Sequence, residues 1–318
     1  MPMQDLPTLQ VKFLSSAEYA AANKTGKTRV LVGSNGKLWM KGEYFGMFRL
    51  NDFDLIAPRP EEIRDVLIKG PAAVASYIVK PDDSHPANTW LYACTDKAYA
   101  LETLPHSMRK NVRRGLREFK IELISADQFL IHGEKAFCDS RQRVGLSDGT
   151  KKEFFRRFET RARIPGHVII GAWKGNTLAA FLFISVIEGW AINEGPFGAD
   201  AFLSDRPNDA LLFWELSRFL HQEQCLGVSA GLSSIQPDGA ESGLHMFKTK
   251  AGFQARAVHR VFVLHPLLVP IANPLTLKSL KLLLHWKSSN RSLRKATGAL
   301  ASILGEEQGF QCLSQSGS

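Results

Sequence analysis

The strongest constraint on this chain is a set of three apolar segments in its second half, separated by very short connections. Residues 168–173, 178–187 and 190–193 are rich in β-branched and aromatic side chains, which favour β-strands. Lys174-Gly175-Asn176 and Glu188-Gly189 join them, and glycine-containing connections of this length are typical of tight turns between antiparallel strands. The pattern predicts a β-meander.

The segments after the meander alternate between helix and strand. Pro207 starts an apolar helix over residues 208–225 and Gly227 follows its end, because proline suits the first turn of a helix and glycine the position after the last. The remaining elements are a strand near 228–232, a helix near 241–251 and a strand near 256–264. This order requires a mixed sheet with helices packed on it, which is the α+β class.

The first half shows a looser version of the same alternation. Asn35-Gly36 lies between two short apolar runs and predicts a β-hairpin. The expected elements that follow are a helix over 61–69, strands over 72–79 and 89–94, and a helix over 104–120. We therefore predict two similar domains over residues 1–125 and 126–265, each a mixed, mostly antiparallel sheet with flanking helices, followed by a basic helical tail over 266–318.

The positive charge of the chain is concentrated in two segments. The 318 residues carry 40 Lys and Arg against 31 Asp and Glu, which gives a formal net charge of +9. Residues 104–120 account for +5 of this charge and residues 266–318 for +4. Localised charge on a balanced body favours specific anionic partners, and a solvated basic helix face is the ordinary alternative for each segment.

The first basic segment carries two stripes at helical spacing. One stripe is apolar and contains Met108, Val112, Leu116 and Phe119; the other contains Arg109, Arg113, Arg117 and Lys120. A helix with this pattern buries one side and presents a row of guanidinium groups on another. We call Arg109, Arg113, Arg114 and Arg117 the arginine row.

Membrane and metal signals are weak in this sequence. The longest apolar run, residues 261–272, is too short to cross a bilayer, and the first residues lack the layout of a secretory signal, so we expect a soluble, cytoplasmic protein. Residues 275–295 are amphipathic and basic, which fits either packing on the domain body or peripheral contact with an anionic membrane. The four cysteines form no C-x-x-C pair and the histidines show no metal-ligand spacing, so no metal site is predicted.

Several motifs resemble those of a known family. Tyr99-Ala100-Leu101 followed by residues 107–114 resembles the basic helix of the Fem-type peptidyltransferases and of related acetyltransferase-like proteins. The family's second signature is similar to residues 207–214, Gly227, residues 243–248 and residues 251–253, in that order. Together these motifs span about residues 99–264, and their order and separation make the resemblance more specific than any one of them.

The resemblance implies tandem domains of the fold found in GCN5-related N-acyltransferases. Such proteins move an acyl or aminoacyl group from acyl-CoA or aminoacyl-tRNA onto an amine, with no permanently bound cofactor. In the Fem-type enzymes the acceptor is a nucleotide- or lipid-linked cell-envelope precursor. The acyl-CoA branch carries a glycine-rich pyrophosphate motif after the last meander strand, and residues 193–200 here have glycines at other spacings, with Pro196 among them.

The candidate catalytic residues follow from these motifs. Amide formation by direct attack needs a base for the amine and a positive group for the oxyanion. Lys248, beside Phe247, is the candidate for the oxyanion, with a surface lysine as the alternative. Glu194 and Asp200 are candidate bases, although loop carboxylates of this kind are more often structural.

The candidate acceptor-binding residues are Arg109, Arg113, Arg114, Asn208 and Phe247. Guanidinium groups match phosphate in a bidentate way, and Asn208 lies where a helix N-terminus offers N–H groups to anions; a plain helix start is its alternative. The interpretation requires the arginine row and the Phe247-Lys248 pair to face a common crevice. His245 is expected to be structural.

We therefore predict an acyl- or aminoacyltransferase that acts on an amine of an anionic, phosphate-containing acceptor related to the cell envelope or to polysaccharide, with tRNA as a possible partner. Two alternatives remain open. One is a nucleic-acid-binding protein that uses the basic helix on an inactive acyltransferase fold. The other is an acyl-CoA N-acetyltransferase that acts on a small amine.

Overall fold

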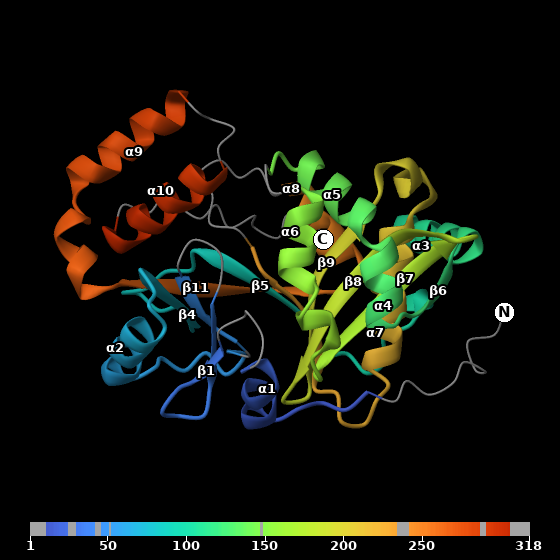
Figure 1. Cartoon of the computed structure of the whole chain (residues 1–318), viewed down its shortest axis with the longest axis horizontal. Helices are drawn as coiled ribbons and strands as arrows, with labels where there is room; N and C mark the ends of the chain where they lie inside the picture. Colours follow the sequence, from blue (N-terminus) through green and yellow to red (C-terminus); the bar gives the residue numbers. More distant parts are fainter. Residues whose placement is uncertain are drawn as a thin grey trace. The chain divides into compact units, whose positions relative to one another are not determined.

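The computed structural model describes residues 11–24, 30–41, 46–50, 52–146, 149–233, 242–286 and 291–305. The chain forms two compact units (Figure 1), and each is assembled from separate stretches of sequence. The first unit draws mainly on Tyr92–Gly231 and Leu244–Ala255, and the second mainly on Arg29–Leu91 and Arg256–Ser318. The chain passes from one unit to the other within strand β5 (Thr89–Cys94) and within strand β11 (Gln254–Leu264).

The predicted meander forms the centre of the first unit. Strands β7 (His167–Lys174), β8 (Thr177–Ile187) and β9 (Trp190–Gly198) pair antiparallel in succession. Strand β6 (Lys120–Leu123) pairs antiparallel with β7, and β10 (Gly227–Leu232) pairs in parallel with β9. The order β10-β9-β8-β7-β6 is thus mixed and mostly antiparallel, as the sequence predicted.

One face of this sheet carries a core of phenylalanines. Helices α4 (Ala126–His132), α5 (Glu134–Arg143) and α6 (Lys151–Phe158) cover it, and Figure 1 shows them in green in front of β7–β9. Seven phenylalanine rings meet there in tilted, edge-on and stacked contacts: Phe129, Phe137, Phe154, Phe158, Phe181, Phe183 and Phe197. Burial of each ring removes apolar surface from water and contributes about 1.5–3 kcal/mol.

Helix α7 (Pro207–Phe219) packs on the same three strands from the opposite face. Helix α3 (His106–Glu118) lies against α7 and contacts the edge strand β6. The close approach occurs at Gly115, where a Cβ atom would lie 2.5 Å from the carbonyl oxygen of Arg206 and 2.7 Å from the Cβ of Ala210. Glycine is therefore required for this helix contact.

The second unit contains the predicted hairpin, formed by β1 (Val30–Val32) and β2 (Leu38–Lys41). Strand β3 (Gly46–Arg49) pairs antiparallel with β2 and in parallel with β4 (Val74–Val79), which pairs antiparallel with β11. Helix α2 (Pro60–Lys69) packs its Ile63, Val66 and Leu67 into a core with strand residues such as Trp39. This sheet is also mixed and mostly antiparallel.

The C-terminal part of the second unit is helical, as predicted. A 3₁₀ segment, η5 (Pro266–Ile271), leads into α9 (Pro274–Trp286), and α10 (Arg291–Ile303) packs alongside α9. Figure 1 shows the two helices, in orange and red, side by side. Among the described residues, none of the helices has the length and apolar character needed to cross a bilayer.

Some elements differ from the predictions. Helix α3 begins at His106, two residues later than the predicted 104, after a 3₁₀ turn, η2 (Leu101–Thr103). Helices α1 (Ser16–Asn23) and α4 and strand β3 were not predicted. Each compact unit combines segments that are far apart in the sequence, because β4 pairs with β11, far downstream. The predicted division was different: two consecutive domains over residues 1–125 and 126–265 and a tail over 266–318. Those boundaries stay a prediction.

Candidate functional site

Strands β9 and β10 separate from each other within the first unit. They are paired at Gly227 with Trp190, at Val228 with Ala191 and at Ser229 with Ile192. Beyond Ile192, β9 continues beside β8 as far as Gly198. We call the place where the two strands separate, at Asn193 of β9 and Ala230 of β10, the divergence point. A parallel pair that opens in this way exposes backbone groups that the ladder no longer satisfies.

Lys248 reaches the divergence point from helix α8 (Ser242–Lys250). Its Nζ donates a hydrogen bond of 2.9 Å to the carbonyl oxygen of Ala230 and lies 4.2 Å from the centroid of the Tyr92 ring. The residue is only 8% exposed. The surface-lysine alternative is therefore wrong: the ammonium group is held inside the unit by a carbonyl dipole and an aromatic face.

The end of α8 fixes where this lysine lies. The N–H of Phe253 bonds back to the carbonyl of Lys248 at 3.2 Å, and Gly252 between them has φ +106°, which a residue with a side chain rarely adopts. Tyr99 closes the turn, because its hydroxyl donates to the carbonyl of Ala251 at 2.9 Å. The Ala-Gly-Phe motif of the sequence is thus a helix stop that aims Lys248 at β10.

Tyr92 connects Lys248 to a second titratable side chain. Its hydroxyl lies 2.9 Å from Nδ1 of His245, which precedes Lys248 by three residues and therefore occupies the same side of α8. Ser229 donates its hydroxyl to the carbonyl of Tyr92 at 3.1 Å. His245, expected to be structural, and Tyr92, which the sequence analysis did not single out, thus belong to the surroundings of Lys248.

A buried carboxyl also lies next to the divergence point, bonded to Asn193. Glu215 of α7 is fully buried, and Asn193 donates to its Oε2 at 2.8 Å. Burial raises the pKa of Glu215 to about 8, so this carboxyl is mostly protonated at neutral pH. Its Oε1 has no hydrogen-bond partner within the described part of the chain. The signal that could have identified it is a single acidic residue inside an otherwise apolar helix.

Glu194, a predicted base, points away from Glu215. Adjacent strand residues face opposite sides of a sheet, so Asn193 faces α7 and Glu194 faces the phenylalanine core. Arg157 donates to Glu194 at 3.0 Å, and Arg161 forms a second ion pair with it. The two guanidinium groups hold the pKa of Glu194 far below its usual range, against the effect of burial. An ionised carboxylate fixed by two arginines is a weak base, and its role as a base stays a prediction.

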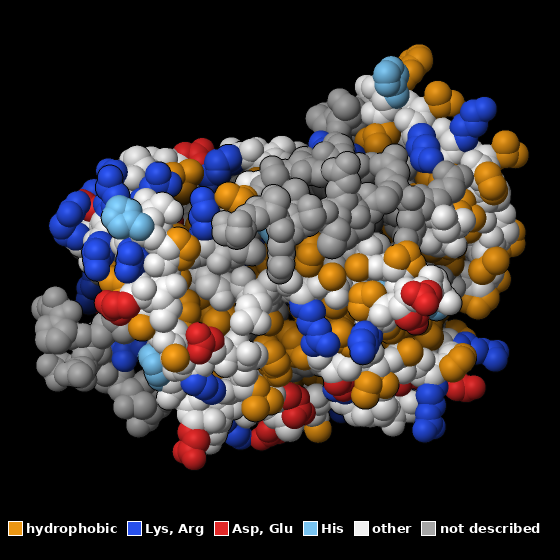
Figure 2. Space-filling model, turned by 180° about the vertical axis from the view of Figure 1, so that it is seen from behind, with side chains coloured by type: hydrophobic (Ala, Val, Ile, Leu, Met, Phe, Trp, Pro, Cys, Tyr) orange, Lys and Arg blue, Asp and Glu red, His pale blue; other side chains and the backbone are white. Residues whose placement is uncertain are grey.

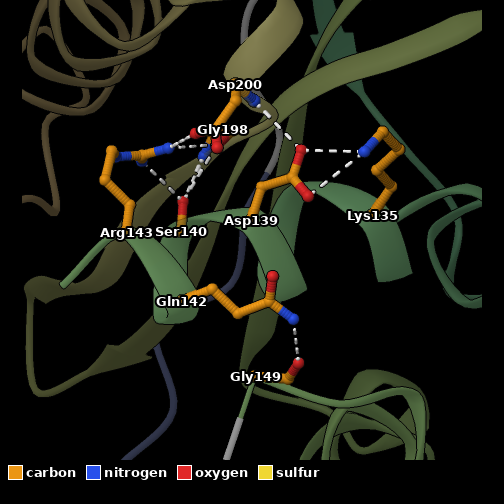
Figure 3. Close-up of polar contacts among 8 residues, drawn as sticks. All are labelled: Lys135, Asp139, Ser140, Gln142, Arg143, Gly149, Gly198 and Asp200. Atoms are coloured by element: carbon orange, nitrogen blue, oxygen red, sulfur yellow. Dashed lines mark hydrogen bonds and ion pairs between the residues drawn. The ribbon is translucent and has the colours of Figure 1, made fainter. Parts of the chain in front are cut away.

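Asp200, the other predicted base, lies beyond the end of β9 in η4 (Asp200–Asp205). Figure 3 shows Asp200 joined to α5. Arg143 forms an ion pair with the Asp200 carboxylate, and the backbone N–H of Asp200 donates to Asp139 at 3.0 Å. Ser140 accepts a hydrogen bond of 2.7 Å from the N–H of Gly198 beside it. These contacts attach the end of β9 to α5, away from Lys248, and a catalytic role for Asp200 stays a prediction.

The arginine row lies elsewhere in the first unit. Arg114 pairs with Asp205 at 2.9 Å, Arg109 reaches the carbonyl of Glu102 at 3.4 Å, and Arg113 is exposed. Helix α3 contacts β6 at one edge of the sheet, whereas Lys248 bonds to β10, which β9, β8 and β7 separate from β6. The requirement that the arginine row and the Phe247-Lys248 pair face a common crevice stays a prediction.

Two further predicted binding residues lie on helices α7 and α8. Asn208 lies in the first turn of α7, after Pro207 as predicted, and a Cβ atom on Gly198 would come within 2.8 Å of its Oδ1. Phe247 is half-buried on α8, next to Lys248. Of the predicted site residues, the structure thus places Lys248 at the divergence point, with Phe247 next to it in sequence, and leaves the arginines and Asp200 on other elements. The described residues contain no group of three or more His, Cys, Asp or Glu side chains that could hold a metal ion.

The fold of this chain resembles that of FemX, a protein of known structure. The match has a TM-score of 0.52 at 9% sequence identity and covers 80% of this chain and 92% of that one. At this identity the similarity concerns the fold alone, and it confirms the Fem-type fold that the motifs predicted.

Two other solved structures are similar at lower scores. One is the C-terminal domain of a putative lysylphosphatidylglycerol synthetase from Agrobacterium fabrum, at 17% identity and TM-score 0.46, covering 78% of this chain and 87% of that one. The other is L-PGS from Bacillus licheniformis, at 13% identity and TM-score 0.47, covering 81% and 90%. No family model and no curated protein matches the sequence.

Proposed function

We propose that this protein is an acyl- or aminoacyltransferase that forms an amide on an amine of an anionic acceptor. The observation that carries the proposal is the buried Lys248 at the divergence point of β9 and β10, on a fold similar to that of FemX. An acyl carbonyl placed there would meet a positively charged ammonium group, which can donate to an oxyanion.

The transfer needs no covalent enzyme intermediate. The acceptor nitrogen attacks the carbonyl carbon of the donor ester or thioester, so that a C–N bond forms and the C–O or C–S bond breaks. The proton lost by the amine passes to the departing oxygen or sulfur, directly or through water. Lys248 stabilises the negative charge that develops on the carbonyl oxygen between these steps.

The backbone after β9 favours an aminoacyl ester over acyl-CoA as donor. A pyrophosphate cradle needs free N–H groups in this stretch. Here the N–H groups of three successive residues are already bonded within the protein: Gly198 to the hydroxyl of Ser140, Ala199 to the carbonyl of Ala179 and Asp200 to the carboxylate of Asp139. We therefore propose aminoacyl-tRNA as the donor.

A thermal-shift panel of acetyl-CoA, aminoacylated tRNA and nucleotide-linked sugars tests this choice. A ligand that binds the folded state raises the melting temperature by mass action, and at about 100 times its Kd the gain is about 2.7 kcal/mol. We expect a shift with aminoacylated tRNA and none with acetyl-CoA. A shift with acetyl-CoA alone would instead support the N-acetyltransferase alternative.

Arg113 is the member of the arginine row best suited to an acceptor phosphate. It is exposed, whereas the guanidinium of Arg114 is already paired with Asp205. We expect Arg113→Ala to raise the KM for the acceptor about tenfold and to change kcat little, because a charge-assisted contact to phosphate contributes about 1.5–3 kcal/mol. Steady-state kinetics with varied acceptor measure this, and Lys110→Ala, which removes an exposed charge on the same helix outside the arginine row, is the control.

If Arg113→Ala lowers kcat and leaves KM unchanged, Arg113 does not bind the acceptor. A steep salt dependence of duplex binding that is lost in Arg113→Ala but unchanged in Lys248→Ala would favour the nucleic-acid-binding alternative.

A further inference from the structure

Helix α9 has two apolar faces, and one of them points away from the protein. Leu277 is buried and Leu280 and Leu284 are half-buried on the side from which α9 packs alongside α10. Leu275, Leu282 and Trp286 follow at spacings of seven and four residues, which places them on one face of the helix. Leu275 is 76% exposed, Leu282 59% and Trp286 85%.

The exposed apolar surface extends beyond this face. Leu283 on α9 is also exposed, as are three residues of the preceding 3₁₀ segment: Leu267, Val269 and Ile271. Figure 2 shows hydrophobic and basic side chains mixed along this part of the molecule, at the upper right of the view. Seven large apolar side chains exposed within twenty residues of sequence form a patch that water-exposed surfaces ordinarily avoid. We call these seven residues the apolar strip.

The charged residues of the segment that carries the apolar strip are all basic. Lys278 is exposed and lies between Leu275 and Leu282 on adjacent turns of α9, and Lys281 is exposed on the same helix. Residues 266–305 contain no Asp or Glu. The strip therefore presents apolar side chains beside lysines without a nearby acidic residue in sequence. An interface with another protein would ordinarily mix charges of both signs in its rim.

We propose that the apolar strip docks on the surface of an anionic lipid bilayer, with α9 lying in the plane of the membrane. Leucine and tryptophan side chains enter the boundary between headgroups and acyl chains, where tryptophan is favoured, and the lysines meet the lipid phosphates. The orientation suits α9 because its inner face is already covered by α10. The inference goes beyond the proposed function, since it needs neither donor nor acceptor.

Co-sedimentation of the full chain with vesicles tests this proposal. We expect binding to vesicles that contain phosphatidylglycerol, much weaker binding to phosphatidylcholine alone, and a loss of binding at high salt because salt screens the lysines. Leu282→Ser with Trp286→Ser should weaken binding at least about tenfold, since two large apolar side chains no longer enter the bilayer. Lys278→Glu should weaken binding to the anionic vesicles and leave the residual binding to neutral vesicles unchanged.

Ile131→Ser is the matched control, because Ile131 is 72% exposed on α4 in the first unit. Equal binding of the wild type and the Leu282→Ser, Trp286→Ser variant would overturn the proposal, and so would equal loss in the control. Sedimentation velocity without lipid tests whether the strip instead binds a second copy of the chain. A dimer that the double variant abolishes would show that it does. Since Lys248→Met should bind vesicles as the wild type does, failure of vesicle binding is distinguishable from failure of the proposed function.

Discussion

Replacing Lys248 by methionine is expected to lower kcat by about 100- to 1,000-fold, the range seen when one oxyanion-stabilising group is removed. Methionine keeps the length and most of the volume of the side chain and removes the ammonium group that contacts Ala230 and Tyr92. The KM for the acceptor should change little, because the lost interaction is strongest in the transition state. Transfer of a radiolabelled aminoacyl group, measured over a range of acceptor concentrations, separates the two constants.

Lys250→Met is the matched control for this variant. It lies on the same helix two residues away and its side chain is exposed, so the same charge is lost without a change at the divergence point. Thermal unfolding of both variants checks that α8 remains folded. Normal turnover in a folded Lys248→Met protein would remove Lys248 from the transfer step, and with it the main support for the proposed function.

Replacing Glu215 by glutamine is expected to stabilise the protein at neutral pH by on the order of 3 kcal/mol. The unfolded carboxyl ionises near its ordinary pKa of 4.5, whereas burial raises the folded pKa to about 8. Between these values the folded state holds a proton that the unfolded state has released. The free energy of unfolding contributed by Glu215 therefore falls as the pH rises from 4.5 to 8, and glutamine removes that fall.

Urea unfolding of the wild type and of Glu215→Gln across pH 4.5 to 8 measures this effect. The two proteins should have similar stability at the acid end and diverge as the pH rises. Glu223→Gln serves as the control, because Glu223 is exposed just past the end of the same helix. Parallel curves for wild type and Glu215→Gln would mean that Glu215 is ionised in the folded protein.

The elements that sequence could predict are those with local signals. The meander follows from apolar runs and glycine turns, α7 from Pro207, and the end of α8 from Gly252. Two missed helices also carried a local signal: Ser15 caps α1 with Glu18, and Ser125 caps α4 with Gln128, in the Ser-x-x-Glu/Gln pattern of a capping box. Strand β3 lacks such a signal, because its four residues are stabilised by pairing with β2 and β4.

The candidate site, too, could be predicted only in part from the sequence. The Phe247-Lys248 motif and the resemblance to the Fem-type family marked the lysine, but only the tertiary structure showed that it is buried against Tyr92 and bonded to Ala230. The arginine row was correctly placed on one helix, yet its distance from Lys248 depends on the strand order of the sheet, which no local pattern encodes.

The sequence by itself determined most of the segments that become helices and strands and which of them carry charge, because hydrophobic periodicity, turn residues and caps act over a few neighbouring residues. Only the tertiary structure determined which partner each polar or charged side chain contacts. Asn193 and Glu194 are adjacent in the chain, but the pleat of β9 sends one to a neutral, buried carboxyl and the other to two arginines. Chemistry at such a site depends on partners from distant segments, and packing chooses those partners.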